Sequence, residues 1–377
     1  MRSDLADTLL AKVLDWKKDQ VSKYRPQIDM LSQIKYDEYQ QFFPGLRFTE
    51  SLASWLNQKD PQDREVLFKF ILERLVFIST REMNQLVSQA FPDFIRPILY
   101  RLAAKKLDCS LYKVNKIENS NEYKGLMRKT LFLGLSDGAR TDVLRRFNPF
   151  ISHEQVLPFY LIPTDKYRDL MDELKNDLLI IDRDMFGSDD NKFMNLVLLD
   201  DFTASGTSYF KHDGLGNFKG KVKKILASLI DERKLGSLFN MSEVNIILVI
   251  YIATERAISV INSAIESWKS SNSHYDDIRI HFKPVFRLTD KICITQDETE
   301  LCKILEKYFD GSILTNSYRK GKHANPYLGF DEGGLPLILN HNTPNNSVSI
   351  LWNEMRSNTT NNNSQIGLFP RVSRHKK

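Results

Sequence analysis

Two adjacent carboxylates and a small polar loop form the part of this sequence best suited to chemistry. Asp200 and Asp201 follow the aliphatic run 196–199 and come directly before the loop 203–208. Neighbouring carboxylates suit sugar hydroxyls or a hydrated Mg²⁺ ion. The loop offers backbone N–H groups and hydroxyl side chains, which suit a phosphate. Together these groups predict a site for a phosphorylated sugar.

A buried strand and the turn that follows it must position these groups. Four consecutive aliphatic residues, 196–199, are typical of a strand buried on both faces of a parallel sheet. Ligands of open α/β sheets bind beyond the carboxyl ends of the strands, which is where the two carboxylates would lie. A buried strand that simply ends in a polar turn is the alternative interpretation.

A second candidate loop follows an earlier predicted strand, 130–135. It contains Ser136, Asp137, Gly138 and Arg140 and leads into a predicted helix. A glycine turn ahead of a helix N-terminus can bind an anion, and the guanidinium of Arg140 adds a forked donor for pyrophosphate oxygens. An ordinary helix cap is the alternative.

A third polar cluster follows the predicted strand 335–339. The amides of Asn342, Asn345 and Asn346 can read the edge of a nucleobase, and Trp352 can stack on it. An asparagine-rich helix cap is the alternative here.

The run LLDDFTASGTS resembles the phosphoribosyl-pyrophosphate (PRPP) signature of type I phosphoribosyltransferases, in which an apolar strand, an acidic pair and a hydroxyl-rich glycine loop follow one another. The resemblance implies that Asp200 and Asp201 bind the ribose hydroxyls and Mg²⁺ and take part in catalysis. It implies that the 136–140 loop binds pyrophosphate. It assigns the 5′-phosphate to the loop residues Thr203, Ala204, Ser205, Gly206, Thr207 and Ser208.

Three features depart from the pattern of that family. Thr203 stands where an aliphatic residue is usual, and Ala204 replaces the first hydroxyl of the loop. These enzymes run directly from the loop into a helix, whereas residues 209–219 intervene here before a predicted helix, 220–235. Because of this insertion, the N-terminus of the helix is not expected to follow the loop directly, and its contribution to phosphate binding is in doubt.

The segment HNTPNNSVSILW, with LFPR further along, resembles one branch of the same superfamily: the phosphoribosyltransferase-like proteins of prokaryotic conflict systems, which occur beside antiviral modules that include some retrons. The resemblance covers about residues 130–371. That branch joins a helical N-terminal region to the sheet domain, so it implies a defence-system effector whose partner proteins bind the helical region.

The 377-residue chain has room for two domains, and its 42% hydrophobic and 27% charged residues are ordinary for a globular protein. Neither an apolar run long enough to span a membrane nor a signal segment is visible, and the three cysteines lack metal spacing. We therefore expect a cytoplasmic protein. A net charge of +5, spread along the chain, does not by itself indicate a nucleic-acid partner.

The expected fold class is α/β: a type I phosphoribosyltransferase-like parallel sheet with helices on both faces, preceded by an all-helical N-terminal domain. Residues 1–106 would form the helical domain and residues 107–377 the sheet domain. Helices are predicted at 297–309 and from Thr343 onward, and the segment 182–192 is either a mobile lid or a plain surface loop. The strands are predicted at 130–135, 159–162, 178–181, 196–199, 244–252, 278–286 and 335–339.

Two functions from different classes fit these observations. The first is binding of PRPP or a related nucleotide with Mg²⁺, followed by transfer or cleavage at the anomeric carbon of the ribose. The second is a non-catalytic nucleotide sensor that relays occupancy of its site to a partner protein. A third possibility is a structural or nucleic-acid-binding protein that has the same fold. Within the helical region 1–106, a DNA-binding pair of helices is the corresponding alternative to a helical bundle.

Overall fold

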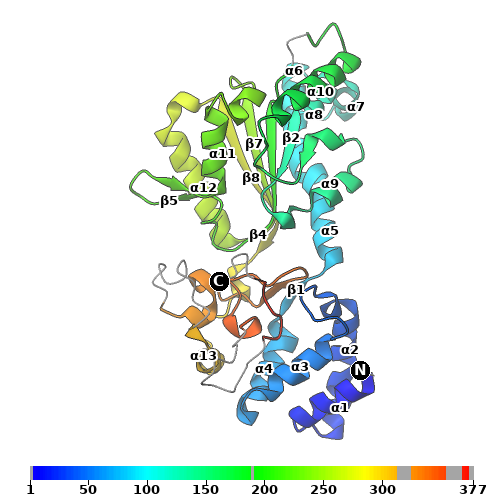
Figure 1. Ribbon diagram of the computed structural model, residues 1–377, viewed down its shortest axis with the longest axis vertical. Coiled ribbons are helices and arrows are strands. Elements are labelled where there is room, and N and C mark those ends of the chain that lie inside the picture. The colour runs from blue at the N-terminus through cyan, green and yellow to red at the C-terminus, as the bar shows by residue number, and fades with distance from the viewer. Residues whose placement is uncertain (1–2, 188–190, 312–323, 354–366, 373–377) are drawn as a thin grey trace. The chain divides into compact units, whose positions relative to one another are not determined.

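The computed structural model describes residues 3–187, 191–311, 324–353 and 367–372. The chain divides into two compact units, which are described separately (Figure 1). Unit 1 consists of residues 1–82 and 291–377, and unit 2 of residues 83–290.

Unit 1 combines the N-terminal helices with the C-terminal part of the chain. Strand β1 (Val76–Ile78) pairs in parallel with β9 (Leu337–Leu339), so that segments far apart in the sequence meet in one small sheet. The helices of this unit are α1 (Ser3–Val13), α2 (Lys18–Ile34), α3 (Phe48–Asn57), α4 (Pro61–Arg74) and α13 (Thr299–Lys307).

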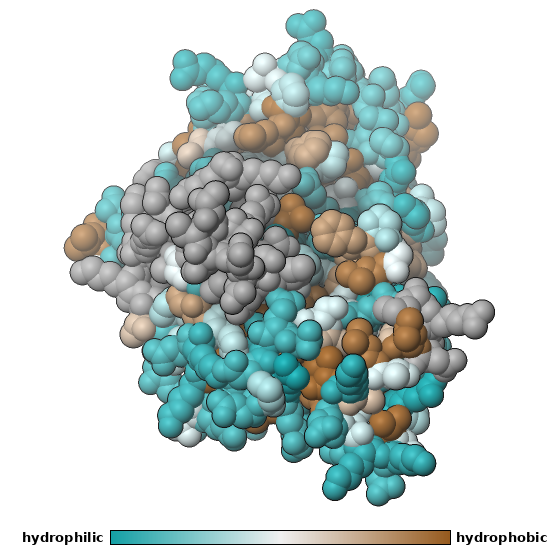
Figure 2. All heavy atoms as spheres, turned by 60° about the horizontal axis from the view of Figure 1, so that its bottom comes forward, coloured by the Kyte–Doolittle hydropathy of each residue, from teal (hydrophilic) through white to brown (hydrophobic). Residues whose placement is uncertain are grey.

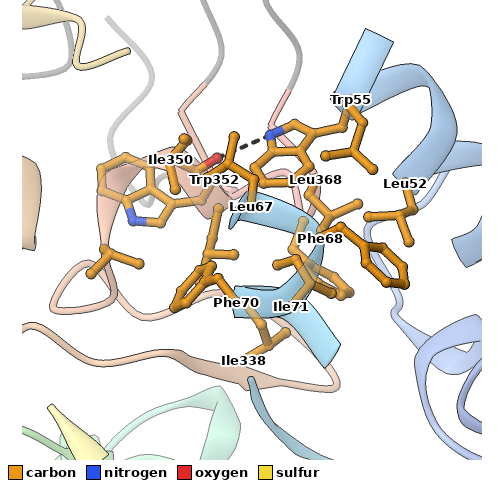
Figure 3. Packing of buried hydrophobic residues seen from close by; sticks show 14 of the residues in the cluster. Leu52, Trp55, Leu67, Phe68, Phe70, Ile71, Ile338, Ile350, Trp352 and Leu368 are labelled. Carbon is orange, nitrogen blue, oxygen red and sulfur yellow. Dashed lines mark hydrogen bonds between the residues drawn. The ribbon is translucent and has the colours of Figure 1, made fainter. Parts of the chain in front are cut away.

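Aromatic and aliphatic side chains from both ends of the chain form the core of unit 1 (Figure 3). Trp55 of α3 is buried, and its Nε1 donates a hydrogen bond to the carbonyl of Ile350 at 3.2 Å. Phe369 stacks on Phe48, with the ring centroids 5.8 Å apart. The C-terminal segment is therefore part of this core rather than an appendage of the sheet domain.

Unit 2 is built on a five-stranded parallel sheet with the order β3-β2-β4-β7-β8. Its central strands β4 and β7 are buried on both faces, as the aliphatic runs predict, and β8 is an edge strand. The strands are β2 (Thr130–Gly134), β3 (Val156–Leu157), β4 (Asn195–Thr203), β7 (Val244–Thr254) and β8 (Ile278–Leu288).

Helices cover both faces of this sheet. One face packs against α10 (Lys166–Ile181), α11 (Lys221–Ile230) and α12 (Glu255–Ser271). The other face packs against the π-helical turn η2 (Ala90–Ile95), where Phe91 contacts Phe132 of β2 with 6.5 Å between the ring centroids. The remaining helices of the unit are α5 (Thr80–Gln89, which begins at the end of unit 1), α6 (Arg96–Lys106), α7 (Val114–Asn119), α8 (Asn121–Arg128) and α9 (Thr141–Phe147).

The register of the sheet brings the two predicted loops together. Gly134, the last residue of β2, lies opposite Leu199 of β4, so the residues that follow each strand emerge at the same edge. A polar ladder fixes this register at the other end: Asn245 donates to Asn195 at 3.1 Å, and Asn195 donates to Thr130 at 3.1 Å. A slip of one residue would break the ladder and turn the apolar side chains to the wrong face.

Three predicted elements are wrong. Residues 178–181 are the last turn of α10 instead of a strand; Leu178 is buried, but Ile180 is 81% exposed. The strand expected at 159–162 is replaced by β3, which lies just before it, and Phe159 points into solvent with 60% exposure. The helix expected from Thr343 does not form, because the chain there runs irregularly until the short turn η11 (Ser349–Leu351).

The division into units also differs from the predicted boundary between residues 106 and 107. Residues 83–106 belong to unit 2. A sheet that is apolar on both faces needs helices on both faces, and η2, with α6 packed next to it, covers the face opposite to α10, α11 and α12. Residues 291–377 belong to unit 1, because their apolar side chains complete the core around α3 and α4.

Hydrophilic side chains predominate on the face of the molecule shown in Figure 2, and the hydrophobic ones gather in small separate groups. None of the helices in the described ranges combines the length and the hydropathy that a bilayer crossing requires.

His281 on the edge strand β8 predicts an acid-sensitive contribution to stability. Burial and the nearby cations Lys283, Lys269, Arg101 and Arg279 lower the pKa of His281 to about 4. Between pH 6.5 and pH 4 the folded state therefore binds fewer protons at this site than the unfolded chain, so stability falls as the pH falls through that window. In the variant His281→Gln, the drop in Tm between pH 6.5 and about pH 4, measured by circular dichroism, should be smaller than in the wild type. An equal drop in both proteins would contradict this assignment.

Candidate functional site

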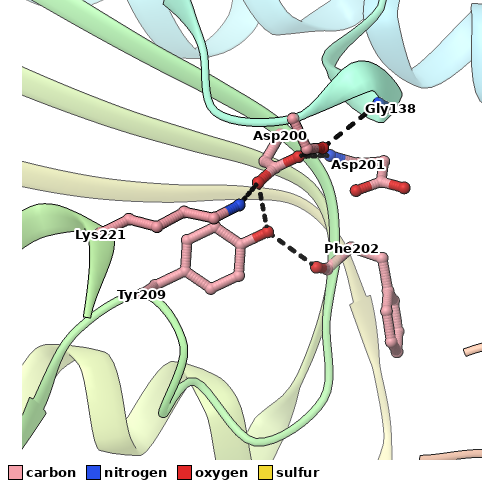
Figure 4. A network of polar contacts seen from close by, with 7 residues as sticks. Gly138, Asp200, Asp201, Phe202, Tyr209 and Lys221 are labelled. Atoms are coloured by element: carbon pink, nitrogen blue, oxygen red, sulfur yellow. Dashed lines mark hydrogen bonds and ion pairs between the residues drawn. The ribbon is translucent and has the colours of Figure 1, made fainter. Parts of the chain in front are cut away.

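Asp200, near the end of β4, is completely buried and is held by four donors (Figure 4). Its Oδ1 accepts from the hydroxyl of Ser136 and from the backbone N–H of Asp201 at 3.1 Å. Its Oδ2 accepts from the hydroxyl of Tyr209 at 2.6 Å and from the ammonium of Lys221 at 2.7 Å. A carboxylate has about four acceptor positions. Groups of the protein therefore occupy all the acceptor positions of the Asp200 carboxylate. The prediction had this carboxylate bind ribose hydroxyls or a metal ion instead.

The charge of Asp200 is balanced inside the protein. Burial and the neighbouring carboxylate of Asp201 raise the pKa of Asp200, whereas Lys221 and the hydroxyl of Ser136 act in the opposite direction. The Lys221 ammonium also lies 4.9 Å from the centroid of the Tyr209 ring, which gives it a second favourable contact. This arrangement is a buried ion pair that fixes the end of β4.

Asp201 is the carboxylate that faces outward. Its side chain is half-buried and turned away from Asp200 (Figure 4). A Cβ atom at Gly138 would lie 2.4 Å from Oδ2 of Asp201, so only glycine allows the loop to approach the carboxylate this closely. The predicted pyrophosphate loop and the predicted sugar-binding carboxylate are thus brought together.

The 136–140 loop is held by hydrogen bonds within itself and by hydrogen bonds to the strands β4 and β7. The hydroxyl of Ser136 accepts from the N–H of Gly138 at 3.2 Å, and Tyr251 donates to the carbonyl of Ala139 at 2.5 Å. Asp137 is exposed, and Arg140 is half-buried with a left-handed backbone (φ 46°). The helix that follows, α9, has only seven residues, so the predicted helix contribution to anion binding at this loop is small.

The 203–208 loop is a compact turn held by its own hydroxyls. Thr203 Oγ1 accepts from the N–H of Gly206 at 3.1 Å, and the hydroxyls of Ser205 and Thr207 are 2.8 Å apart. Within the described residues, the N–H groups of Ser205 and Ser208 donate to no other group of the protein. Thr203 and Ala204 are buried, and Ala204 is anchored through its carbonyl, which accepts from Thr254 at 2.5 Å. Ser205 and Gly206 are buried as well, and exposure increases through Thr207 to Ser208, so that end of the loop is the part that solvent reaches.

Gly206 gives a direct test of this loop. Its φ of +71° is a left-handed conformation, and a Cβ atom there would lie 2.8 Å from the carbonyl oxygen of Ala257 in α12. The variant Gly206→Ala should therefore distort the loop and weaken binding of a phosphorylated ligand at least about tenfold. Gly311→Ala is the matched control, because that glycine is exposed, lies outside the candidate lid 182–192, and its Cβ would meet no atom within 4 Å. Calorimetric titration with ribose 5-phosphate measures both; equal affinity of the two variants would argue against a phosphate at this loop.

The insertion after the loop does not displace the next helix. It forms a hairpin of β5 (Lys211–His212) and β6 (Phe218–Lys219), and the chain then returns to the loop. The N–H of Lys221 donates to the carbonyl of Ser208 at 3.0 Å, and the N–H of Val222 donates to that of Tyr209 at 2.9 Å. Helix α11 therefore begins beside the loop in spite of the insertion, and its first residue supplies the partner of Asp200.

Tyr209 and Lys221 are the functional residues that the sequence reasoning missed. Tyr209 comes just after the recognised motif, and Lys221 is separated from it by the hairpin. A lysine at the first position of a helix is common on protein surfaces. The one available signal was that a buried pair of acids requires a cation nearby.

The asparagine cluster belongs to unit 1 and is used there structurally. The amide of Asn342 donates to the carbonyl of Val372 at 3.0 Å, and that of Asn346 donates to the carbonyl of Phe330 at 2.8 Å. The backbone carbonyl of Asn345 accepts from the N–H of Phe330 at 2.7 Å. Trp352 is only 8% exposed, so its ring is not open for stacking on a base, contrary to the prediction.

The predicted lid is described only in part, since residues 188–190 lie outside the described residues. Its first turn is anchored: Asp182 accepts from the N–H groups of Asp184 at 2.9 Å and Met185 at 3.0 Å. These bonds, and one from Asn121 at 2.8 Å, lower the pKa of Asp182.

Comparison with protein families gives one match. The model of the family PRTase-CE matches residues 52–371, which is most of the chain and includes both loops and the acidic pair. No significant match was found among curated proteins or among solved structures. The predicted resemblance and the predicted phosphoribosyltransferase-like α/β fold class are thereby confirmed. The chain belongs to the PRTase-CE family of phosphoribosyltransferase-like proteins.

Proposed function

We propose that unit 2 binds PRPP or a related nucleotide and catalyses transfer or cleavage at the anomeric carbon of its ribose. The observation that carries this proposal is the close approach of the 136–140 loop to Asp201, the half-buried carboxylate at the end of β4. Gly138 approaches Asp201 so closely that no side chain fits between them, and the loop 205–208 begins four residues after Asp201 in the sequence.

Each part of the site has a distinct role in this proposal. Asp201 binds the ribose hydroxyls, and the loop 205–208 binds the 5′-phosphate through N–H and hydroxyl groups. The 136–140 loop binds the pyrophosphate. Asp200 is a positioning residue, because its four internal hydrogen bonds hold the end of β4 and, through Ser136, the neighbouring loop.

Mg²⁺ is compatible with this set of donors. In the described residues, no three His, Cys, Asp or Glu side chains converge to hold a metal ion. Mg²⁺ commonly uses one or two carboxylates together with substrate phosphates, so Asp201 and the pyrophosphate would hold it. When bound, it would offset the negative charge of the pyrophosphate.

The reaction makes few demands on acid–base chemistry. The bond between the anomeric carbon and the leaving group breaks through an oxocarbenium-like state, and the leaving group departs with the bonding electrons. Fixed N–H donors and carboxylates stabilise these charges without rearrangement. The acceptor nucleophile then forms the new bond and loses its proton to solvent or to the leaving group.

Turnover is tested by incubating the protein with PRPP and Mg²⁺ and following PRPP loss and pyrophosphate release by chromatography. Release in the presence of a panel of nucleobases, or of water alone, would identify transfer or hydrolysis. PRPP that remains intact under all these conditions, although it binds, would contradict catalysis on PRPP.

A non-catalytic nucleotide sensor is the second candidate. It is favoured by Ala204, which offers no hydroxyl where the family's loops have one, and by the saturation of Asp200 inside the protein. Unit 1 would relay occupancy of the site to other proteins. Binding without turnover would support this candidate.

We also propose that the protein is an effector of a prokaryotic antiviral defence system of the kind that the sequence resemblance implies, retron systems included. The match to the PRTase-CE family is compatible with that role. Survival of phage-infected cells that carry the wild-type or the Asp201→Asn gene in its native operon tests that role. Equal protection by both genes would show that the site is not needed for defence.

A further inference from the structure

A cavity in unit 2 lies away from the two loops. It has a volume of about 570 Å³, within the range of small-molecule sites. It is formed before β2 and β3 begin, by the ends of α8 and α10 and by η2. Strand β2 separates it from the 136–140 loop, which follows the other end of that strand. Its apolar lining consists of Phe91, Tyr123, Met127, Phe150, Ile180 and Ile181.

One wall of this cavity carries a buried cation. Arg128 is only 6% exposed and donates through Nε to Asp177 at 2.5 Å. Its Nη1 is buried and has no hydrogen-bond partner among the described residues. Because Nη1 is out of reach of solvent, the guanidinium acts on a ligand in the cavity through its charge rather than through that atom. The lining carries three cations, Arg96, Lys124 and Arg128, against two carboxylates, Glu118 and Asp177, and so has a net positive charge. Guanidinium groups bind carboxylates and related anions with particular strength.

The rest of the lining suits a flat apolar body. Phe91 and Phe150 lie with their ring centroids 5.1 Å apart. Phe150 is 61% exposed and Ile180 is 81% exposed, so large apolar side chains meet solvent at this cavity. Gln155 stiffens the wall, since its amide donates to the carbonyls of Met127 and Thr130, each at 2.7 Å. The cavity is therefore a formed feature of the fold rather than a gap between loose segments.

We propose that this cavity binds a small molecule with a flat apolar body and one negatively charged group, such as an aromatic carboxylate. The ring lies among the apolar side chains, and the anionic group meets the guanidinium of Arg128. Arg96 and Lys124 also line the cavity and add positive charge, of which Glu118, 3.9 Å from the guanidinium of Arg96, offsets one part. This site is separate from the proposed PRPP site and does not depend on it.

The test uses the full chain and the fluorescent probe anilinonaphthalene sulfonate, which has an aromatic body and one negative charge. Saturable fluorescence should be displaced by naphthoate at least about tenfold more effectively than by the uncharged naphthylmethanol, because only the acid pairs with Arg128. Equal displacement by both compounds would overturn the assignment of an anionic ligand.

Two variants locate the site. Ile180→Trp should narrow the cavity and weaken binding of the probe at least about tenfold, whereas Leu161→Trp, at another exposed apolar residue with 75% exposure, should leave it unchanged. Arg128→Met should abolish the preference for naphthoate over naphthylmethanol. If Arg128→Met does not fold, the Ile180→Trp and Leu161→Trp pair still decides the location: equal binding by both would place the probe elsewhere and refute the proposal.

Discussion

The variant Asp201→Asn is expected to lose PRPP binding and turnover by at least about a hundredfold while it keeps its fold. Two charge-assisted hydrogen bonds to ribose hydroxyls are worth roughly 3–6 kcal/mol together, which corresponds to about 10²–10⁴-fold in affinity. Asn has the same shape but no charge. Because Asp201 is half-buried and faces outward, its replacement removes little that the fold needs.

The control for this variant is Asp142→Asn. Asp142 is exposed and makes a surface ion pair with Arg146, four residues along the same helix, so the same chemical change there should leave both binding and stability nearly unchanged. Thermal melts confirm that both variants fold. Retained turnover in a folded Asp200→Asn, Asp201→Asn double variant would refute the assigned role of the acidic pair.

Lys221→Met is expected to destabilise the protein by about 2–4 kcal/mol, because it leaves Asp200 buried without its cation. Loss of Lys221 should raise the pKa of Asp200 further, since Lys221 is the main group that opposes burial. An acid whose folded-state pKa is raised binds more protons in the folded state, so stability falls as the pH rises through that pKa. Urea unfolding should therefore show a larger loss at pH 7 than at mildly acidic pH.

Two further variants separate charge from packing at this position. Lys223→Met, at an exposed position of the same helix, should change stability by less than about 0.5 kcal/mol. Adding Asp200→Asn to Lys221→Met removes the uncompensated charge and should recover part of the loss. If Lys221→Met and Lys223→Met unfold at the same urea concentration, the ion pair does not hold the end of β4.

Local patterns predicted the centre of unit 2 well. The aliphatic run of β4 and the strand predicted at 244–252, which is β7, both form strands buried on their two faces. A cap at Thr254, whose hydroxyl accepts from the N–H of Ala257, begins the helix that follows β7. The positions of both loops relative to β2 and β4 follow from parallel pairing alone. These features could be predicted because each depends only on residues that are close in the sequence or on the pairing of two neighbouring strands.

Features that depend on distant residues could not be predicted in this way. The two acids look equivalent in the sequence, and only the return of the chain through the β5–β6 hairpin brings Lys221 to Asp200, which is completely buried, whereas Asp201 is half-buried. The pairing of β1 with β9 joins residues more than half the chain apart, so the place of the C-terminal segment in unit 1 was not visible. The aliphatic run 178–181 imitates a strand in the sequence, whereas in the structure Leu178 and Ile180 lie on different sides of α10, one buried and the other exposed.

The measurement that tests the central claim most directly is calorimetric titration of the wild-type protein with PRPP, with and without Mg²⁺, beside the Asp201→Asn variant. We predict saturable binding to the wild type that is strengthened by Mg²⁺ and lost in the variant. Absence of PRPP binding to the wild type under both conditions, or equal binding to the folded variant, would contradict the assignment of Asp201 and its two loops as a PRPP site.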